Sequence, residues 1–454
     1  MMGRKMMTAR GASLSALIVL VVALAGCDTV TSTFDTIMGD KGKPPLPGKR
    51  VDVLPLDQPV KADADLASRD VALPHPEPNT EWPQAGGFPD HAMQHLALSG
   101  PLKELWNTGI GEGSSRYSRI LSQPVVADGH IFGMDGEDIV FALDAATGKR
   151  LWNFDTKPDK ERDSTFGGGV AYSEGKLFVT TGYGDVLALD AADGKQIWRR
   201  HTEAPLRGSP TVMGGRVLAV NVNNQLTALA VSDGQKLWSH TGLPESADLL
   251  GTPAPAVAGD TVVAAYSSGE LFALRLENGH PVWTDNLAVA QPLGALNALA
   301  DIRGRPVIDR GRVFAVSHSG RMVAIDLRTG DRVWEQDIGG SQGPWVAGDY
   351  VYVLSNDTTL LCLTWKDGKV RWARNLPRYG NEKKKKDPIM WVGPVLAGDR
   401  LIVVSSTGEA FSVSPYTGEP LGRTEFPSGV FVDPVVANNT VYVLTDDADL
   451  IALR

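Results

Sequence analysis

The segment Val186-Leu-Ala-Leu-Asp-Ala-Ala-Asp-Gly-Lys-Gln-Ile-Trp198 decides the fold, because it recurs along the whole second part of the chain. In each copy, alternating apolar residues predict a strand, and an Asp-Gly or Thr-Gly pair predicts a tight turn in which glycine supplies the positive φ. The tryptophan then begins the returning strand. Clear copies occupy residues 139–152 and 322–334, and weaker copies end at Trp238, Trp283 and Trp372.

The glycines of these turns set the period of the repeat. Successive glycines lie 38 to 51 residues apart, which is the length of a four-stranded propeller blade. A second strand–turn–strand pattern, such as residues 124–132 or 210–218, precedes the copies, so each repeat supplies four short strands. In the last copy we expect Leu421 at the position of the tryptophan. The turn glycines are Gly148, Gly194, Gly234, Gly279, Gly330, Gly368 and Gly418.

Seven turn glycines predict seven blades, and residues 432–454 begin an eighth that lacks its last strand. The segment around Trp106 is a spare strand of the right type, so we expect it to complete that blade. The sequence therefore predicts an all-β, eight-bladed propeller over residues 81–454, closed by an N-terminal strand without an open sheet edge. The tryptophans are expected to pack between neighbouring blades; a ring that stacks on a ligand is the alternative.

Residues 1–26 have the organisation of an export signal. Three basic residues come first, and an apolar run over residues 14–24 follows that is too short for a confident transmembrane helix. The segment Leu24-Ala-Gly-Cys27 resembles a bacterial lipobox, which implies cleavage before Cys27 and its acylation. Residues 27–80 are rich in proline and predict a disordered tether, because they cannot bury enough apolar surface to fold.

The composition narrows the possible partners and chemistry. The formal net charge of −9 disfavours nucleic-acid binding, which needs a positive surface. The second of the two cysteines, Cys362, lies in an apolar strand and is expected to be a small buried side chain. Two cysteines give no disulfide framework and no zinc-site spacing. His91 and His95, in the segment before the first blade, are expected to lie on the surface.

One basic run stands out in this acidic chain. Residues 383–386 are all lysine and lie in an insertion between Trp372 and Trp391. A solvated loop is one interpretation. Docking to anionic headgroups or to an acidic partner is the other.

The repeat resembles the PQQ-type propeller repeat over residues 106–454. Together with the lipobox, the tether and the count of eight blades, the chain resembles the BamB family, propeller lipoproteins of the outer-membrane β-barrel assembly machinery. The resemblance implies a non-catalytic scaffold without a cofactor. It also implies an anchor in the outer membrane facing the periplasm, although Asp28 resembles an inner-membrane retention signal and leaves the inner membrane open.

The resemblance also implies the partners. Family members bind the POTRA domains of the barrel-inserting subunit, and unfolded outer-membrane proteins are further partners that it suggests. Docking through loops and pairing of an outer strand with an extended client are both possible modes of binding. The sequence does not select between them.

The family's contact residues fall on two segments of this chain. In a leucine-rich stretch Leu249 matches, and Leu250 stands where arginine is expected. In an acidic pair Asp301 matches the first acid, and Arg303 replaces the second with the opposite charge. We therefore predict Leu249, Leu250, Asp301 and Arg303 as partner-binding residues. The alternative is that they only lead into inner strands.

A PQQ-dependent quinoprotein dehydrogenase is the rival from the enzymes that share this repeat. Those enzymes hold calcium and the quinone at the propeller centre, often beside an adjacent cysteine pair. This chain has no such pair, and no clustered acidic set at the starts of its inner strands, although a calcium site needs several converging oxygen ligands. We predict no catalytic residue and no metal ligand. A generic envelope adaptor remains a third interpretation.

Overall fold

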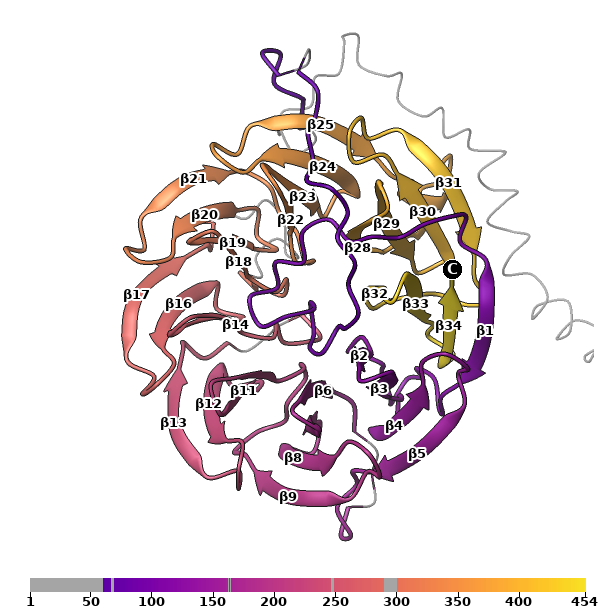
Figure 1. Cartoon of the computed structure of the whole chain (residues 1–454). Coiled ribbons are helices and arrows are strands. Elements are labelled where there is room, and N and C mark those ends of the chain that lie inside the picture. The colour runs from indigo at the N-terminus through magenta and orange to yellow at the C-terminus, as the bar shows by residue number, and fades with distance from the viewer. Residues whose placement is uncertain (1–59, 67–68, 162, 164, 246–248, 290–299) are drawn as a thin grey trace, which may run out of the picture. The chain divides into compact units, whose positions relative to one another are not determined.

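The computed structural model describes residues 60–66, 69–161, 163, 165–245, 249–289 and 300–454. The chain divides into two units, residues 1–58 and 59–454. The predicted signal peptide and Cys27 therefore lie outside the described residues. Where the chain is described, its regular elements are strands, and eight four-stranded antiparallel sheets surround one axis (Figure 1). The predicted eight-bladed propeller is confirmed.

Each blade runs from an inner strand at the axis to an outer strand at the rim. Blades 1 to 4 consist of β2 (Val125–Ala127), β3 (His130–Met134), β4 (Ile139–Asp144) and β5 (Arg150–Asp155); β6 (Gly168–Ser173), β7 (Lys176–Thr181), β8 (Asp185–Asp190) and β9 (Gln196–His201); β10 (Thr211–Met213), β11 (Arg216–Val220), β12 (Gln225–Ala230) and β13 (Lys236–Thr241); and β14 (Ala256–Ala258), β15 (Thr261–Ala265), β16 (Glu270–Arg275) and β17 (Pro281–Asn286).

The later blades follow the same order, and a separate two-stranded hairpin of β26 (Tyr379–Asn381) and β27 (Lys386–Pro388) precedes blade 7. Blades 5 to 8 consist of β18 (Val307–Asp309), β19 (Arg312–Val316), β20 (Met322–Asp326) and β21 (Arg332–Gln336); β22 (Trp345–Ala347), β23 (Tyr350–Leu354), β24 (Thr359–Thr364) and β25 (Val370–Asn375); β28 (Trp391–Ala397), β29 (Arg400–Ser405), β30 (Glu409–Val413) and β31 (Pro420–Glu425); and β32 (Val435–Ala437), β33 (Thr440–Leu444), β34 (Asp449–Leu453) and β1 (Glu104–Gly109).

The ring closes where the sequence predicts. Strand β1 pairs antiparallel with β34, with Trp106 opposite Ala452, so the outer strand of blade 8 comes from the N-terminal side of blade 1. Among the described residues, no helix is long and apolar enough to cross a membrane.

The tryptophans pack between blades, as predicted. Trp152 of blade 1, for example, donates from Nε1 to the Ala191 carbonyl of blade 2 at 3.0 Å. The turn glycine Gly194 has φ +74°, and a Cβ there would lie 2.6 Å from the Trp152 ring. Glycine is therefore needed both for its conformation and for the close approach of the ring. Equivalent bonds run from Trp198, Trp238, Trp283, Trp334 and Trp372 to the following blades.

The expectation for Leu421 is wrong. Gly422 pairs with Ser412 in the register position that Trp152 takes opposite Ala142, and Leu421 is 58% exposed. The repeat itself places Gly422 at this position, because each tryptophan stands four residues after its turn glycine, as Trp152 does after Gly148, and Gly422 stands four residues after Gly418. That no tryptophan stands there has a topological reason. The outer strand of blade 8 is β1, so no turn joins β34 to it, and no turn glycine is present to receive a tryptophan from blade 7.

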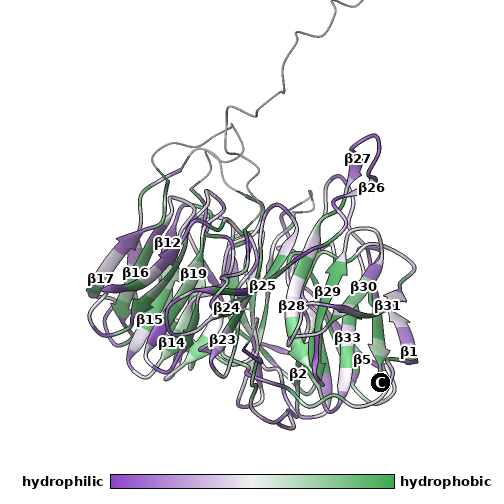
Figure 2. Ribbon diagram, turned by 90° about the horizontal axis from the view of Figure 1, so that it is seen from above, coloured by the Kyte–Doolittle hydropathy of each residue, from purple (hydrophilic) through white to green (hydrophobic). Residues whose placement is uncertain are grey.

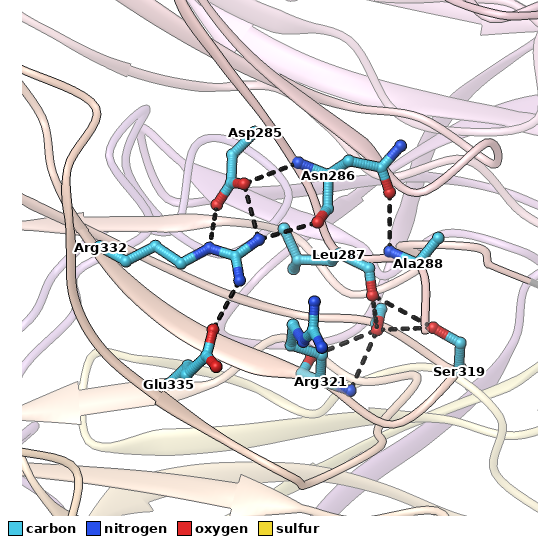
Figure 3. A network of polar contacts seen from close by, with 9 residues as sticks. Asp285, Asn286, Leu287, Ala288, Ser319, Arg321, Arg332 and Glu335 are labelled. Carbon is cyan, nitrogen blue, oxygen red and sulfur yellow. Dashed lines mark hydrogen bonds and ion pairs between the residues drawn. The ribbon is translucent and has the colours of Figure 1, made fainter. Parts of the chain in front are cut away.

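Polar contacts also join neighbouring blades at the rim. Figure 3 shows the junction of blades 4 and 5, where the Arg332 guanidinium donates to both oxygens of Asp285 at 2.7 Å and to the Asn286 carbonyl at 2.8 Å. This bidentate bond raises the pKa of Arg332 and keeps the pair charged. The Leu287 carbonyl accepts from Ser319 at 3.3 Å. The start of the connection that leads to Asp301 is thus fixed.

A segment before the first blade closes one end of the central channel. This segment, which we name the belt, comprises residues 77–98 and runs once around the axis (Figure 1). It bonds to the inner strand or inner turn of each blade in turn. The partners are Asn79 with Asn438, Trp82 with Val126, Pro83 with Tyr172, Gln84 with Val212, Pro89 with Val257, Asp90 with Ile308, Gln94 with Gly348, and Leu96 with Leu396 and Gly398.

Two histidines expected on the surface are buried in the belt. His91 is 5% exposed and His95 is 1% exposed, so that expectation is wrong. The Nδ1 atoms of His91 and His95 lie 2.7 and 2.8 Å from the carbonyls of Pro306 and Pro74. Burial lowers the pKa of His91 to about 3, so this ring is neutral at physiological pH.

The described part of the predicted tether lies on blade 6. The Asp63 amide donates to the Val370 carbonyl at 2.8 Å, and its carboxylate lies 3.9 Å from Lys369. Val71 is 6% exposed. Residues 60–66 and 69–80 therefore also belong to the folded body, which begins earlier in the sequence than the expected boundary at residue 81.

Candidate docking surface at the propeller axis

The two faces of the propeller differ in what they present. The turn face carries the turns between first and second strands, such as residues 128–129, and between third and fourth strands, such as residues 145–149. The connection face carries the links between blades, such as residues 249–255 and 300–306. The belt contacts residues beside the inner turns, so it closes the channel at the turn face. Among the described residues, no comparable segment crosses the axis at the connection face.

A shallow pocket occupies this end of the axis. Its walls come from the connections that precede the inner strands, and Ala85 of the belt contributes to its lining from below. The charged side chains that line it are Arg207, Arg303, Arg305 and Asp433. Arg305 and Asp433 form an ion pair with each other.

The structure brings the four predicted partner-binding residues together. The Leu249 amide donates to Asp301 Oδ2 at 2.8 Å, and Arg303 Nε donates to the Leu250 carbonyl at 2.8 Å. Two bonds thus join the connection before blade 4 to the connection before blade 5, although 52 or more residues separate the partners in sequence. The leucine pair is therefore held in a fixed position at the mouth of the pocket.

The four residues differ in what they offer to a partner. Asp301 is 2% exposed, so its carboxylate positions the Leu249 backbone and does not face solvent. Leu250 is 37% exposed and presents an apolar side chain beside the pocket. Arg303 lines the pocket and is also 3.4 Å from the Ser341 carbonyl. That they contact a partner stays a prediction.

Burial and neighbouring acids act on Arg303 in opposite directions. Burial lowers the pKa of its guanidinium, while the carboxylates of Asp433 and Asp301 raise it. Arginine stays protonated at such shifts. The mouth of the pocket therefore carries a fixed positive charge beside an exposed leucine.

Two arginines of this surface were missed in the sequence, although a signal exists for one of them. The segments Arg207-Gly-Ser-Pro210 and Arg303-Gly-Arg-Pro306 occupy the same place in two repeats, directly before an inner strand. A repeated Arg-Gly at the end of a connection places the side chain at the axis. Of the two, Arg207 could have been identified from this pattern, whereas Arg305 stands where the other repeat has Ser209 and carries no such signal.

Other reactive groups are dispersed. Over the described ranges, no group of three or more His, Cys, Asp or Glu side chains is arranged to hold a metal ion. Cys362 is fully buried, as predicted, and burial raises the pKa of its thiol.

Comparison with known proteins identifies the relatives of this chain. A family model described as outer membrane protein assembly factor BamB matches residues 103–164, 136–374 and 380–454. The protein of that name from Yersinia pestis is 27% identical over 235 residues, 52% of this chain and 58% of the relative. The one from Alkalilimnicola ehrlichii is 27% identical over 252 residues, 55% of this chain and 52% of the relative. The chain thus spans about half the length, or less, of the curated relatives it matches.

Solved structures share the fold. The crystal structure of BamB from Moraxella catarrhalis superposes with a TM-score of 0.63 at 17% identity and covers 78% of this chain and 98% of that chain. A europium-containing methanol dehydrogenase superposes with a TM-score of 0.65 at 15% identity over 81% of this chain and 89% of that chain. A BamB protein and a dehydrogenase therefore share the propeller fold.

Proposed function

Because this chain belongs to the family of outer membrane protein assembly factor BamB, we propose that it is a non-catalytic scaffold of outer-membrane protein assembly. It binds the POTRA domains of the barrel-inserting protein with its connection face and assists the insertion of β-barrel proteins. Acylated Cys27 anchors it to the outer membrane on the periplasmic side. Unfolded outer-membrane proteins are its further partners.

One observation carries this proposal. Two hydrogen bonds between connections hold Leu249 and Leu250 against Asp301 and Arg303, and they leave Leu250 exposed and Arg303 half-buried at the end of the axis that the belt does not cover. A fixed apolar side chain next to a half-buried positive charge is the arrangement of an interface anchor. The two bonds preorganise Leu250 and Arg303, which lowers the entropy lost on docking.

The proposal is tested by measuring the affinity between the full lipidated chain and the barrel-inserting protein in one mild detergent. Leu250→Asp places a charge in the apolar contact and should weaken binding at least about tenfold. Leu151→Asp is the matched control, because Leu151 is 46% exposed on the outer strand of blade 1, away from the axis. Equal affinities for both variants, or no binding by the unchanged chain, contradict the proposed role.

A quinone-dependent dehydrogenase makes a different prediction. Such an enzyme, purified with added PQQ and calcium, should carry a chromophore in stoichiometric amount and oxidise alcohols. A generic adaptor should instead retain a different envelope protein during purification. Mass spectrometry of the co-purified proteins separates the assembly factor from the adaptor.

A further inference from the structure

The connection between blades 6 and 7 carries a built projection, which we name the lysine hairpin and define as residues 379–388. It consists of β26 and β27, paired with Tyr379 opposite Pro388 and Asn381 opposite Lys386. The hairpin stands above the connection face in Figure 2. Its tip contains the run Lys383, Lys384, Lys385 and Lys386, all exposed.

The base of the hairpin is fixed to the blade. The Ile389 amide donates to the Arg378 carbonyl at 3.0 Å, and Trp391 Nε1 donates to the Pro377 carbonyl at 2.8 Å. Trp391 is 5% exposed. Within the turn, Glu382 Oε1 accepts from the amide of Arg378 at 2.8 Å. The lysines therefore project from an anchored stem and not from a free loop.

Two acids, Glu382 and Asp387, flank the four lysines in sequence, so the hairpin keeps a net positive charge. None of the four lysines forms an ion pair among the described residues, whereas exposed Lys195 and Lys369 pair with Asp193 and Asp63. Four adjacent positive charges repel one another, and the chain carries a net charge of −9. A concentrated positive charge at the end of a stem is suited to attract an acidic surface.

The position of the hairpin favours a protein surface over a lipid surface. It rises from the same face as the pocket with Arg303 and the exposed Leu250. The described end of the tether lies on the opposite, turn face of blade 6, where Asp63 contacts Val370. The hairpin and the start of the anchored segment thus belong to different faces.

We propose that the lysine hairpin is a second docking element, which binds an acidic surface of the same protein that occupies the connection face. This inference rests on the proposed function. The hairpin contributes to binding by charge attraction, so it should accelerate association with the partner. Salt screens this attraction beyond about 10 Å at 0.1 M ionic strength. The apolar contact at Leu250 then supplies the salt-independent part of the affinity.

The test replaces the four lysines of the hairpin with glutamine. A matched control replaces Lys149, Lys195, Lys236 and Lys366, which are exposed in or directly after turns of the opposite face, so the net charge changes equally. At about 50 mM salt the hairpin variant should bind the barrel-inserting protein about tenfold more weakly than the unchanged chain. At about 500 mM salt the affinities should converge, and the control should follow the unchanged chain throughout.

A label separates protein from lipid as the occupant. Because Cys362 is buried, Lys384→Cys introduces an accessible thiol for an environment-sensitive dye. The dye should respond to the barrel-inserting protein and not to phosphatidylglycerol vesicles. A response to the vesicles alone, or a hairpin variant with unchanged affinity at every salt concentration, overturns the inference. Absence of any binding by the unchanged chain instead overturns the proposed function, and this inference with it.

Discussion

Replacing Trp82 with alanine should release the belt from the propeller. Trp82 is 1% exposed, stacks on Trp345 with 6.2 Å between ring centroids, and exchanges two backbone bonds with Val126 at 2.7 and 2.9 Å. The backbone bonds survive the substitution, so the loss is the buried ring. Burial of roughly 200 Å² at about 25 cal/mol per Å² gives about 5 kcal/mol as an upper value. Tryptophan-to-alanine changes in cores cost about 3–5 kcal/mol.

Hydrogen exchange with mass spectrometry measures this loss directly, because the belt can open without unfolding the blades. A cost of about 3 kcal/mol corresponds to exchange that is faster by more than about a hundredfold in residues 77–98. Phe88→Ala is the matched control, since Phe88 lies in the same belt and is 42% exposed. Equal exchange in both variants would refute the conclusion that Trp82 holds the belt in place. The same holds if Trp82→Ala leaves residues 77–98 as protected as before.

Two further predictions concern stability. Gly194→Ala should lower the free energy of unfolding more than Gly175→Ala does. The two glycines have nearly the same φ, +74° and +75°, but only a Cβ at 194 would clash, at 2.6 Å from Trp152. Urea unfolding should give a loss of about 1 kcal/mol for Gly175→Ala and clearly more for Gly194→Ala. Burial raises the pKa of Asp138 from 3.8 to about 7. Between pH 4 and pH 7 the unfolded chain releases this proton and the folded chain keeps it, so the free energy of unfolding of the wild-type chain should fall by up to about 4 kcal/mol as the pH rises. Asp138→Asn should remove this loss and unfold at higher urea than wild type at pH 8, with a smaller difference at pH 5.

The blades could be predicted because their signals are local. Each strand pair, turn glycine and tryptophan lies within one period of about 40 residues, and the same pattern recurs. The position of Gly422, four residues after Gly418, also follows from the repeat, but the reason why no tryptophan stands there does not. That reason lies in blade 8, where the outer strand comes from the other end of the chain. The closure of the ring, and not the repeat, thus decides that no tryptophan stands at this position.

The belt could not be predicted from periodicity, because it has none. Each of its bonds reaches a different blade, and the bond between Gln84 and Val212, for example, spans 128 residues. A segment of this kind resembles a linker in composition. The same holds for the candidate site, where the resemblance named Leu249 and Asp301 separately. The bond that joins their connections follows only from the closed ring.

One feature of the docked tether was nevertheless visible in the sequence. In other blades a polar residue and then an aliphatic residue precede the tryptophan. In blade 6 this order is reversed, because Val370 comes before Arg371. Val370 is 7% exposed and belongs to a core cluster that Val60 packs against, so the exchange places an aliphatic side chain where residues 60–66 lie. Residues 60–66 thus lie at the turn face, which the belt also covers at the axis, and among the described residues the connection face is the side on which the pocket with Arg303 is accessible to a partner. Other blades have the usual order in Arg150-Leu151, Gln196-Ile197, Lys236-Leu237 and Arg332-Val333.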